Sequence, residues 1–297
     1  MKILIGIDGS ASAATALRTA EHLLKPAGRE MNILCVAPAY RHGPEHGRQE
    51  YVRRILNETN RILEKARRMA ARDQKLNLLA EIGSPSAVLV DKSEDYDLTV
   101  IGPRGYGASS DGGLGPVASR VAENAPGPVL IGRELRNEDG IRILAAVDGS
   151  LASVHALEAL RDLFNLSSAE VCLMYVTETP WIQLGLEEDW ETYSEEDQEK
   201  SESGVFEKEL VREGEEIVER ARDLLSGSRA AVSTRMSEGN PANEILSEAE
   251  RGQYDLVVVG ATGARDLKHR MLGSVSAKLA AAAPCSVLIV REREELG

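Results

Sequence analysis

The chain has 297 residues, 42% of them hydrophobic, and a formal net charge of −13. This length suits one large domain or two ordinary ones, and the composition excludes a wholly disordered chain. The acidic balance argues against nucleic-acid binding, and no apolar run approaches the roughly 20 residues of a membrane helix.

Two further features predict a cytoplasmic location. The first residues, MKILIGIDGS, form a strand-like run that contains an aspartate, and they lack the apolar core and cleavage site of a signal peptide. The three cysteines, Cys35, Cys172 and Cys285, show no metal-binding spacing and lie in or beside strand-like runs. We therefore expect buried, reduced thiols.

In chain order, the first half predicts alternating strands and helices. Strands are expected at 3–7, 31–36, 76–82, 98–102 and 129–131, and helices at 11–24, 49–72, 84–93 and 116–124. The apolar runs are continuous rather than alternating, which is typical of parallel strands buried on both faces. Right-handed crossovers then give a doubly wound α/β domain, with five parallel strands in the order 3-2-1-4-5 flanked by helices.

The second half repeats the first. KILIGIDGSASAATAL matches RILAAVDGSLASVHAL, so that Asp148 aligns with Asp8 at an offset of 140 residues. YDLTVIG and APGPVLIG match YDLVVVG and APCSVLIV at an offset of 158. We predict two tandem homologous domains, at residues 1–135 and 141–297, joined by a short polar linker.

The larger offset toward the end places an insertion in the second copy, at about residues 178–216. It carries 15 acidic and 3 basic side chains and both tryptophans of the chain, Trp181 and Trp190. The favoured interpretation is a solvated acidic loop that runs into a longer helix. A lid or partner surface anchored by the tryptophans is the alternative.

The strongest chemical signal is GATGARDLKHRMLGS, residues 260–274, between a strand and a helix of the second copy. Backbone N–H groups in such a loop point at a bound anion, and the helix dipole favours negative charge. Gly260 and Gly263 allow close approach of the backbone, and Ser274 adds a hydroxyl. A basic cluster suits a triphosphate, although ordinary surface charge explains it equally well. Its members are Arg265, Lys268, His269 and Arg270.

The spacing G-x₂-G-x₉-G-[S/T], met at Gly260, Gly263, Gly273 and Ser274, occurs with D-G-S after the first strand. This combination resembles the universal stress protein family, and the repeat resembles its tandem members. The resemblance spans both halves apart from the insertion. It implies an ATP-binding C-terminal domain, with ATP bound with or without Mg²⁺, in a nucleotide-dependent stress-response or signalling module.

The resemblance also implies which residues form the site. Asp148 would contact the adenosine moiety, although an aspartate there can equally support the turn before the next helix. The backbone of Val176 would meet adenine, and that of Val259 would line the nucleoside end. The full set is Ala146, Val147, Asp148, Val176, Val259, Gly260, Gly263, Arg265, Gly273, Ser274, Val275 and Ser276.

The first copy departs from this pattern. Gly102, Gly105 and Gly115 keep the spacing, but Pro116 stands where the second copy has Ser274, and Ala118 where it has Ser276. Proline removes a hydroxyl and a backbone N–H from the phosphate cradle, and each lost donor to a charged group costs about 1.5–3 kcal/mol. The segment YGASSDGGL also lacks the basic residues of its counterpart. We expect this copy to bind ATP weakly or not at all.

Two other functions stay open. One is slow ATP hydrolysis or nucleotidyl transfer, which the lack of an obvious general base in the loop disfavours. The other is a scaffold that docks an unknown protein partner through the acidic insertion. Members of the resembled family commonly pair through their last strands, so PVLIG and SVLIV are expected to pair within this chain as an internal pseudo-dimer. A homodimer of two chains is also open.

Overall fold

The computed structural model describes residues 1–39, 45–70, 75–106, 113–137, 140–178, 202–263 and 272–291. The N-terminal half contains β1 (Lys2–Gly6), α1 (Ala11–Leu23), β2 (Glu30–Pro38), α2 (Glu45–Met69), β3 (Lys75–Gly83), α3 (Pro85–Ser93), β4 (Leu98–Ile101), α4 (Pro116–Asn124) and β5 (Val129–Ile131). The C-terminal half contains β6 (Arg142–Ala146), α5 (Leu151–Leu163), β7 (Glu170–Thr177), α8 (Glu202–Leu225), β8 (Ala231–Glu238), α9 (Pro241–Arg251), β9 (Leu256–Gly260), α10 (Ser274–Ala282) and β10 (Ser286–Val290).

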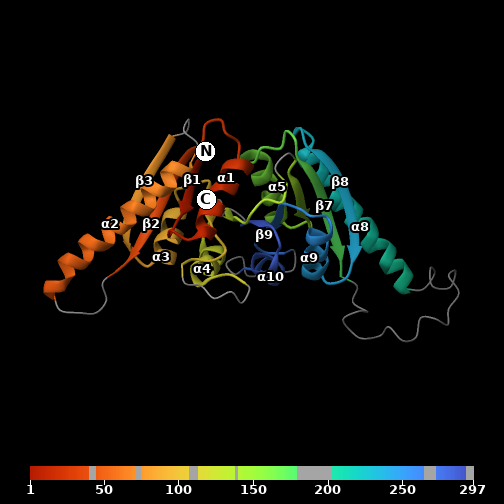
Figure 1. Cartoon of the computed structure of the whole chain (residues 1–297). Coiled ribbons are helices and arrows are strands. Elements are labelled where there is room, and N and C mark those ends of the chain that lie inside the picture. Colours follow the sequence, from red (N-terminus) through yellow and green to blue (C-terminus); the bar gives the residue numbers. More distant parts are fainter. Residues whose placement is uncertain are drawn as a thin grey trace, which may run out of the picture.

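The strands of both halves form one continuous sheet of ten, in the order β3-β2-β1-β4-β5-β10-β9-β6-β7-β8 (Figure 1). Within each half the neighbouring strands are parallel and follow the predicted order 3-2-1-4-5. The central strands are buried on both faces, which explains their continuous apolar runs. The predicted doubly wound α/β fold is confirmed.

Helices cover both faces of the sheet. One apolar core joins one face to α1, α2, α5 and α8, and a second joins the other face to α3, α4, α9 and α10. The part of the predicted insertion from residue 202 onward belongs to α8, as a longer helix would require. Trp181 and Trp190 lie outside the described residues. No helix among the described residues has the length and apolar character needed to span a membrane.

The two halves meet about a pseudo-twofold axis. β5 and β10 pair antiparallel with Leu130 opposite Leu288, two residues that occupy equivalent positions in the repeat. Leu24 and Phe164, again equivalent positions, form a second antiparallel bridge just after α1 and α5. The predicted pairing of the last strands is therefore confirmed, and the helix ends add a second contact that the sequence did not suggest.

Two arginines, one on each side of this axis, hold the halves together through hydrogen bonds to backbone carbonyls. The guanidinium of Arg133, just after β5, donates to the carbonyls of Ala280 and Cys285, at 2.6 and 3.1 Å, at the end of α10. Arg291, its equivalent after β10, donates to carbonyls at the end of α4. Those carbonyls belong to Ala122, Glu123 and Ala125. Each guanidinium thus donates to carbonyls that a helix leaves unpaired at its C-terminal end.

The cysteines are free and buried, as expected. Burial raises the pKa of the Cys35 thiol to about 11 and that of the Cys285 thiol to about 12. Both groups are therefore neutral thiols near pH 7.

Candidate functional site

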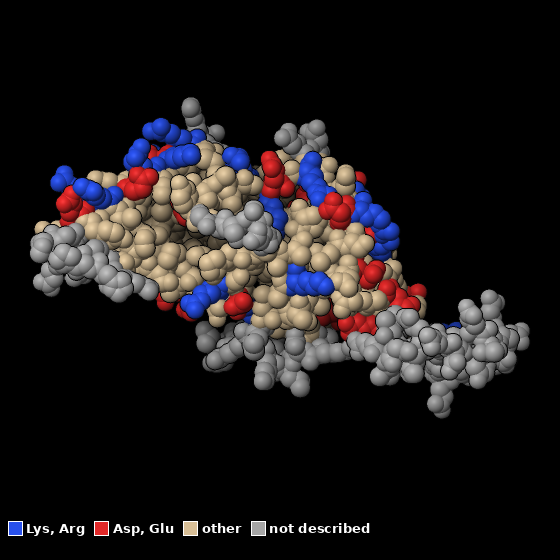
Figure 2. All heavy atoms as spheres, turned by 60° about the horizontal axis from the view of Figure 1, so that its bottom comes forward, with Lys and Arg blue, Asp and Glu red and all other residues tan. Residues whose placement is uncertain are grey.

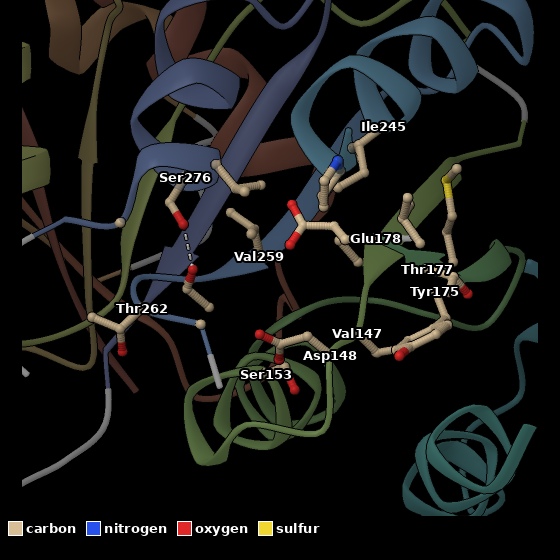
Figure 3. Close-up of a pocket in the computed structure, with 18 of the residues that line it drawn as sticks. Val147, Asp148, Ser153, Tyr175, Thr177, Glu178, Ile245, Val259, Thr262 and Ser276 are labelled. Atoms are coloured by element: carbon tan, nitrogen blue, oxygen red, sulfur yellow. Dashed lines mark hydrogen bonds between the residues drawn. The ribbon is translucent and has the colours of Figure 1, made fainter. Parts of the chain in front are cut away.

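A cavity of about 410 Å³ opens at the carboxyl ends of β6, β7 and β9 in the C-terminal half (Figure 3). The strand order reverses at β6, which lies between β7 and β9. Open α/β sheets bind ligands at such a switch point. Every predicted site residue except Arg265 lines this cavity, and Arg265 lies outside the described residues. The residues brought together are Ala146, Val147, Asp148, Val176, Val259, Gly260, Gly263, Gly273, Ser274, Val275 and Ser276.

Gly260 ends β9 against the start of α5. A Cβ atom at this position would lie 2.8 Å from the carbonyl carbon of Ala152 and 2.9 Å from the nitrogen of Ser153. Contacts this short with backbone atoms force the strand or the helix to move. The glycine is therefore needed for packing, and this packing fixes one wall of the cavity.

Replacing Gly260 with alanine should lower the free energy of unfolding by about 1–2 kcal/mol, because a backbone contact must open. Gly227→Ala is the matched control, since a Cβ there meets nothing within 4 Å. We expect the control to change stability by less than about 0.5 kcal/mol. Urea unfolding of both variants measures the difference, and equal losses would remove the packing argument.

Asp148 supports the turn into α5. Its Oδ1 accepts hydrogen bonds from the backbone N–H of Ser150 at 3.0 Å and from the Ser150 hydroxyl at 2.6 Å. Ser150 Oγ in turn accepts from the N–H of Ser153 and caps the helix. The second carboxylate oxygen faces Gly263, where a Cβ would lie 3.1 Å from it. The structural role that the sequence left open is thus present, and the carboxylate also borders the cavity (Figure 3).

The start of α10 forms the other end of the cavity. Gly273 donates to the carbonyl of Ala261 at 2.8 Å, and the helix begins at Ser274 without a side-chain cap from the described residues. The first N–H groups of a helix have no partner within the helix, and they carry its positive dipole end. Ser274, Val275 and Ser276 all line the cavity, so this helix start is placed to receive an anion.

Ser276 can offer fewer hydrogen-bond donors to a ligand than Ser274. Its side chain is only 3% exposed, and its hydroxyl donates to the carbonyl of Gly260 at 2.6 Å (Figure 3). The proton of this hydroxyl therefore holds α10 to the end of β9. The backbone N–H is the donor that Ser276 has left for a ligand, whereas Ser274 is exposed and offers a hydroxyl as well.

Three carboxylates line the cavity: Asp148, Glu178 and Glu213. Glu178 reaches from the end of β7 toward Val259 (Figure 3). The described lining residues include no lysine or arginine, and the rest of the predicted basic cluster, 268–270, lies outside the described residues. Figure 2 brings the face with the carboxyl ends of the strands forward, and it shows acidic side chains gathered toward the outer end of the C-terminal half.

Sequence reasoning missed the residues that α8 and α9 contribute. These are Leu210 and Glu213 on α8, and Pro241 and Ile245 on α9. The repeat held a usable signal, because Leu210 and Glu213 align with Ile55 and Glu58 of the first copy at an offset of 155.

The N-terminal half has a counterpart cavity of about 530 Å³, which Gly102, Gly105, Pro116 and Ala118 help to line. The segment without basic residues starts at Tyr106, and Arg104 lies just before it. Arg104 lines the cavity, and its Nε donates to the carbonyl of Gly113 at 2.9 Å. The first copy therefore keeps one cation at its cavity.

Fold and site together define a doubly wound α/β protein with a cavity at the switch point of each half. The model of the universal stress protein family matches residues 1–133 and 141–291. A universal stress protein of Mycolicibacterium smegmatis is 27% identical over 306 residues, which cover 98% of this chain and 97% of that protein. One from Methanocaldococcus jannaschii is 32% identical over 161 residues, 53% of this chain and 87% of that protein. The chain belongs to the universal stress protein family, with two copies of the domain in tandem.

Solved structures agree with this fold. The crystal structure of a universal stress protein from Archaeoglobus fulgidus DSM 4304 matches with a TM-score of 0.62 and 20% sequence identity. The match covers 99% of this chain and 98% of that one.

Proposed function

We propose that the C-terminal half binds ATP and that the chain acts as a nucleotide-dependent stress-response or signalling module. The observation that carries the proposal is the start of α10, which opens without a side-chain cap into a cavity bordered by Gly260 and Gly263. We further propose domains at residues 1–135 and 141–297, and a cytoplasmic location that suits the buried free thiols.

The cavity has the two ends that a nucleotide needs. The anion end is the start of α10, where Ser274 offers a hydroxyl and Ser274, Val275 and Ser276 offer successive backbone N–H groups. Away from it, Val147, Val176 and Ile245 give apolar walls against which a base can lie. The volume of about 410 Å³ falls in the range of small-molecule pockets.

Two of the lining carboxylates support one orientation of the nucleotide. Glu178 and Glu213 would repel a phosphate chain, so the phosphates belong at α10 and the base at the ends of β7 and α8. A carboxylate accepts hydrogen bonds from the amino group that adenine carries and hypoxanthine lacks. We therefore expect ATP to bind more tightly than ITP.

Magnesium needs no protein site of its own in this proposal. The described residues contain no group of three or more His, Cys, Asp or Glu side chains that could hold a metal ion. Any Mg²⁺ would then be carried by the triphosphate, and the basic cluster at 265–270 would supply further positive charge.

The test is to denature purified chain, identify the released nucleotide and count it per chain. We expect intact ATP at one equivalent, and calorimetric titration of the emptied protein should rank ATP above ITP. Released ADP would favour the hydrolytic alternative, and no bound or titratable nucleotide would favour the scaffold. Two equivalents of ATP would contradict the expected loss of binding in the first copy.

A further inference from the structure

The cavity of the N-terminal half lies at the carboxyl ends of β1, β2 and β4, and it is the larger of the two described here. Most of its lining residues are equivalent in the repeat to residues that line the C-terminal cavity. Ile55 of α2 corresponds to Leu210 of α8, and Val36 of β2 corresponds to Val176 of β7. Differences between the two cavities therefore report what each can bind.

The anion end differs most. Helix α4 begins at Pro116, which has no N–H, whereas α10 begins at Ser274. The N–H of Gly115 donates to the carbonyl of Pro103 at 2.8 Å, as that of the equivalent Gly273 does to Ala261. Ala118 has no hydroxyl, but the equivalent Ser276 already donates its hydroxyl to the carbonyl of Gly260. The helix start therefore loses the two donors of Ser274, its backbone N–H and its hydroxyl, that a triphosphate would use.

The polar groups deep in the N-terminal cavity already have partners. Asp8 accepts from the N–H of Ser10 at 2.9 Å through one oxygen and from the N–H of Tyr106 at 2.7 Å through the other. Thr59 is 3% exposed, and its hydroxyl donates to the carbonyl of Ile55 at 2.8 Å.

The remaining polar groups are neutral or held elsewhere. Cys35 is 4% exposed, and burial keeps its thiol protonated. Arg104 is tied through Nε to Gly113, and Glu58 forms an ion pair with Arg61 at 3.2 Å. The rest of the cavity wall is mainly apolar. It includes Val36, Ile55, Ile62, Leu89, Ile101 and Val117.

A paired exchange of side chains separates the two cavities in size. In the C-terminal half, Tyr175 lies against Gly214, where a Cβ atom would lie 2.7 Å from the tyrosine ring. The N-terminal half has Cys35 in place of Tyr175 and Thr59 in place of Gly214. Cys35 and Thr59 line the N-terminal cavity, and Tyr175 lines the C-terminal one. We attribute the larger N-terminal volume to the small thiol that stands where the second copy has the tyrosine ring.

We propose that the N-terminal cavity binds an uncharged, predominantly apolar small molecule instead of a nucleotide. An apolar ligand gains from the burial of its surface and asks for none of the donors that α4 has lost. The same face of the N-terminal half is largely neutral where the described atoms are visible (Figure 2). The tandem chain then has two different sites, one for a nucleotide and one for an apolar compound.

The test uses the full chain and the uncharged fluorescent probe N-phenyl-1-naphthylamine. We expect saturable binding of one probe per chain, unaffected by ATP. The anionic relative 8-anilino-1-naphthalenesulfonate should bind more weakly. If the anionic probe binds more tightly and loses that affinity in Arg104→Gln, the site is an anion site and the proposal is wrong. Displacement of the neutral probe by ATP would also overturn it.

Replacing two wall residues of the N-terminal cavity by their equivalents in the second copy shows whether the probe binds there. The double variant Cys35→Tyr with Thr59→Gly should weaken probe binding about tenfold or more, because the ring takes the ligand's space. The mirror variant, Tyr175→Cys with Gly214→Thr, should leave the affinity of the N-terminal cavity for the probe unchanged. If circular dichroism shows that the first variant is unfolded, Ile55→Trp fills the same cavity from a partly exposed position on α2. Unchanged binding in a folded cavity-filling variant would refute the proposal.

Discussion

Replacing Ser274 with proline should abolish the retention of ATP by the purified chain. The change removes a hydroxyl and a backbone N–H from the start of α10, each worth about 1.5–3 kcal/mol to a charged ligand. Together these losses correspond to a rise in the dissociation constant of about 100-fold or more. The fold should survive, because proline is favourable at the first position of a helix and Pro116 occupies the equivalent position in α4.

The controls divide this effect into its parts. Ser274→Ala keeps the N–H and removes only the hydroxyl, so its loss of affinity should be about tenfold. Thermal unfolding of all three proteins without nucleotide should give similar midpoints. ATP retained by a folded Ser274→Pro variant at wild-type affinity would show that the triphosphate does not use this helix start.

Removing the side chain of Arg133 should weaken the junction of the two halves. In Arg133→Ala the carbonyls of Ala280 and Cys285 lose their partner in a part-buried contact between two buried residues and the other half. Each unsatisfied buried group costs about 1–3 kcal/mol, so we expect the free energy of unfolding to fall by about 3 kcal/mol or more. Urea denaturation followed by circular dichroism measures the loss.

The control for Arg133 is an arginine that makes only an exposed contact. The side chain of Arg54 is 80% exposed and pairs with Glu50 on the same helix at 2.5 Å. Exposed pairs of this kind contribute about 0.3–0.5 kcal/mol, so Arg54→Ala should be nearly neutral. An equal fall in the free energy of unfolding in both variants would mean that the hydrogen bonds of Arg133 do not stabilise the junction.

Helix α10 links the two expected results. Its first turn lines the proposed nucleotide site, and its last turn is held by Arg133 from the other half. A ligand that binds only the folded state stabilises it by an amount set by its concentration over Kd, about 2.7 kcal/mol at 100 times Kd. ATP should therefore restore part of the stability that Arg133→Ala loses, and it should fail to do so when Ser274→Pro is added.

Much of the architecture followed from the sequence because its signals are local or repeated. Continuous apolar runs indicate strands buried on both faces, and the internal repeat applies one strand order to both halves. The loop with Gly260, Gly263 and Gly273 follows a predicted strand, so the sequence placed it at the carboxyl edge of the sheet, where parallel strands end together. Even the pairing of β5 with β10 was accessible, since it joins equivalent segments of two copies.

The tertiary structure alone decided what individual side chains do. The hydroxyl of Ser276 turns to the carbonyl of Gly260, and Glu213 enters the cavity because α8 packs across the end of β7. Arg104 lines the N-terminal cavity, and Arg133 reaches a helix that lies more than a hundred residues away in the chain. Such contacts depend on how helices cross the sheet and which rotamers fit there, and no spacing in the sequence records either. The pattern that determines strand order occurs twice in the sequence, whereas the contacts between distant side chains form only when the helices pack on the sheet.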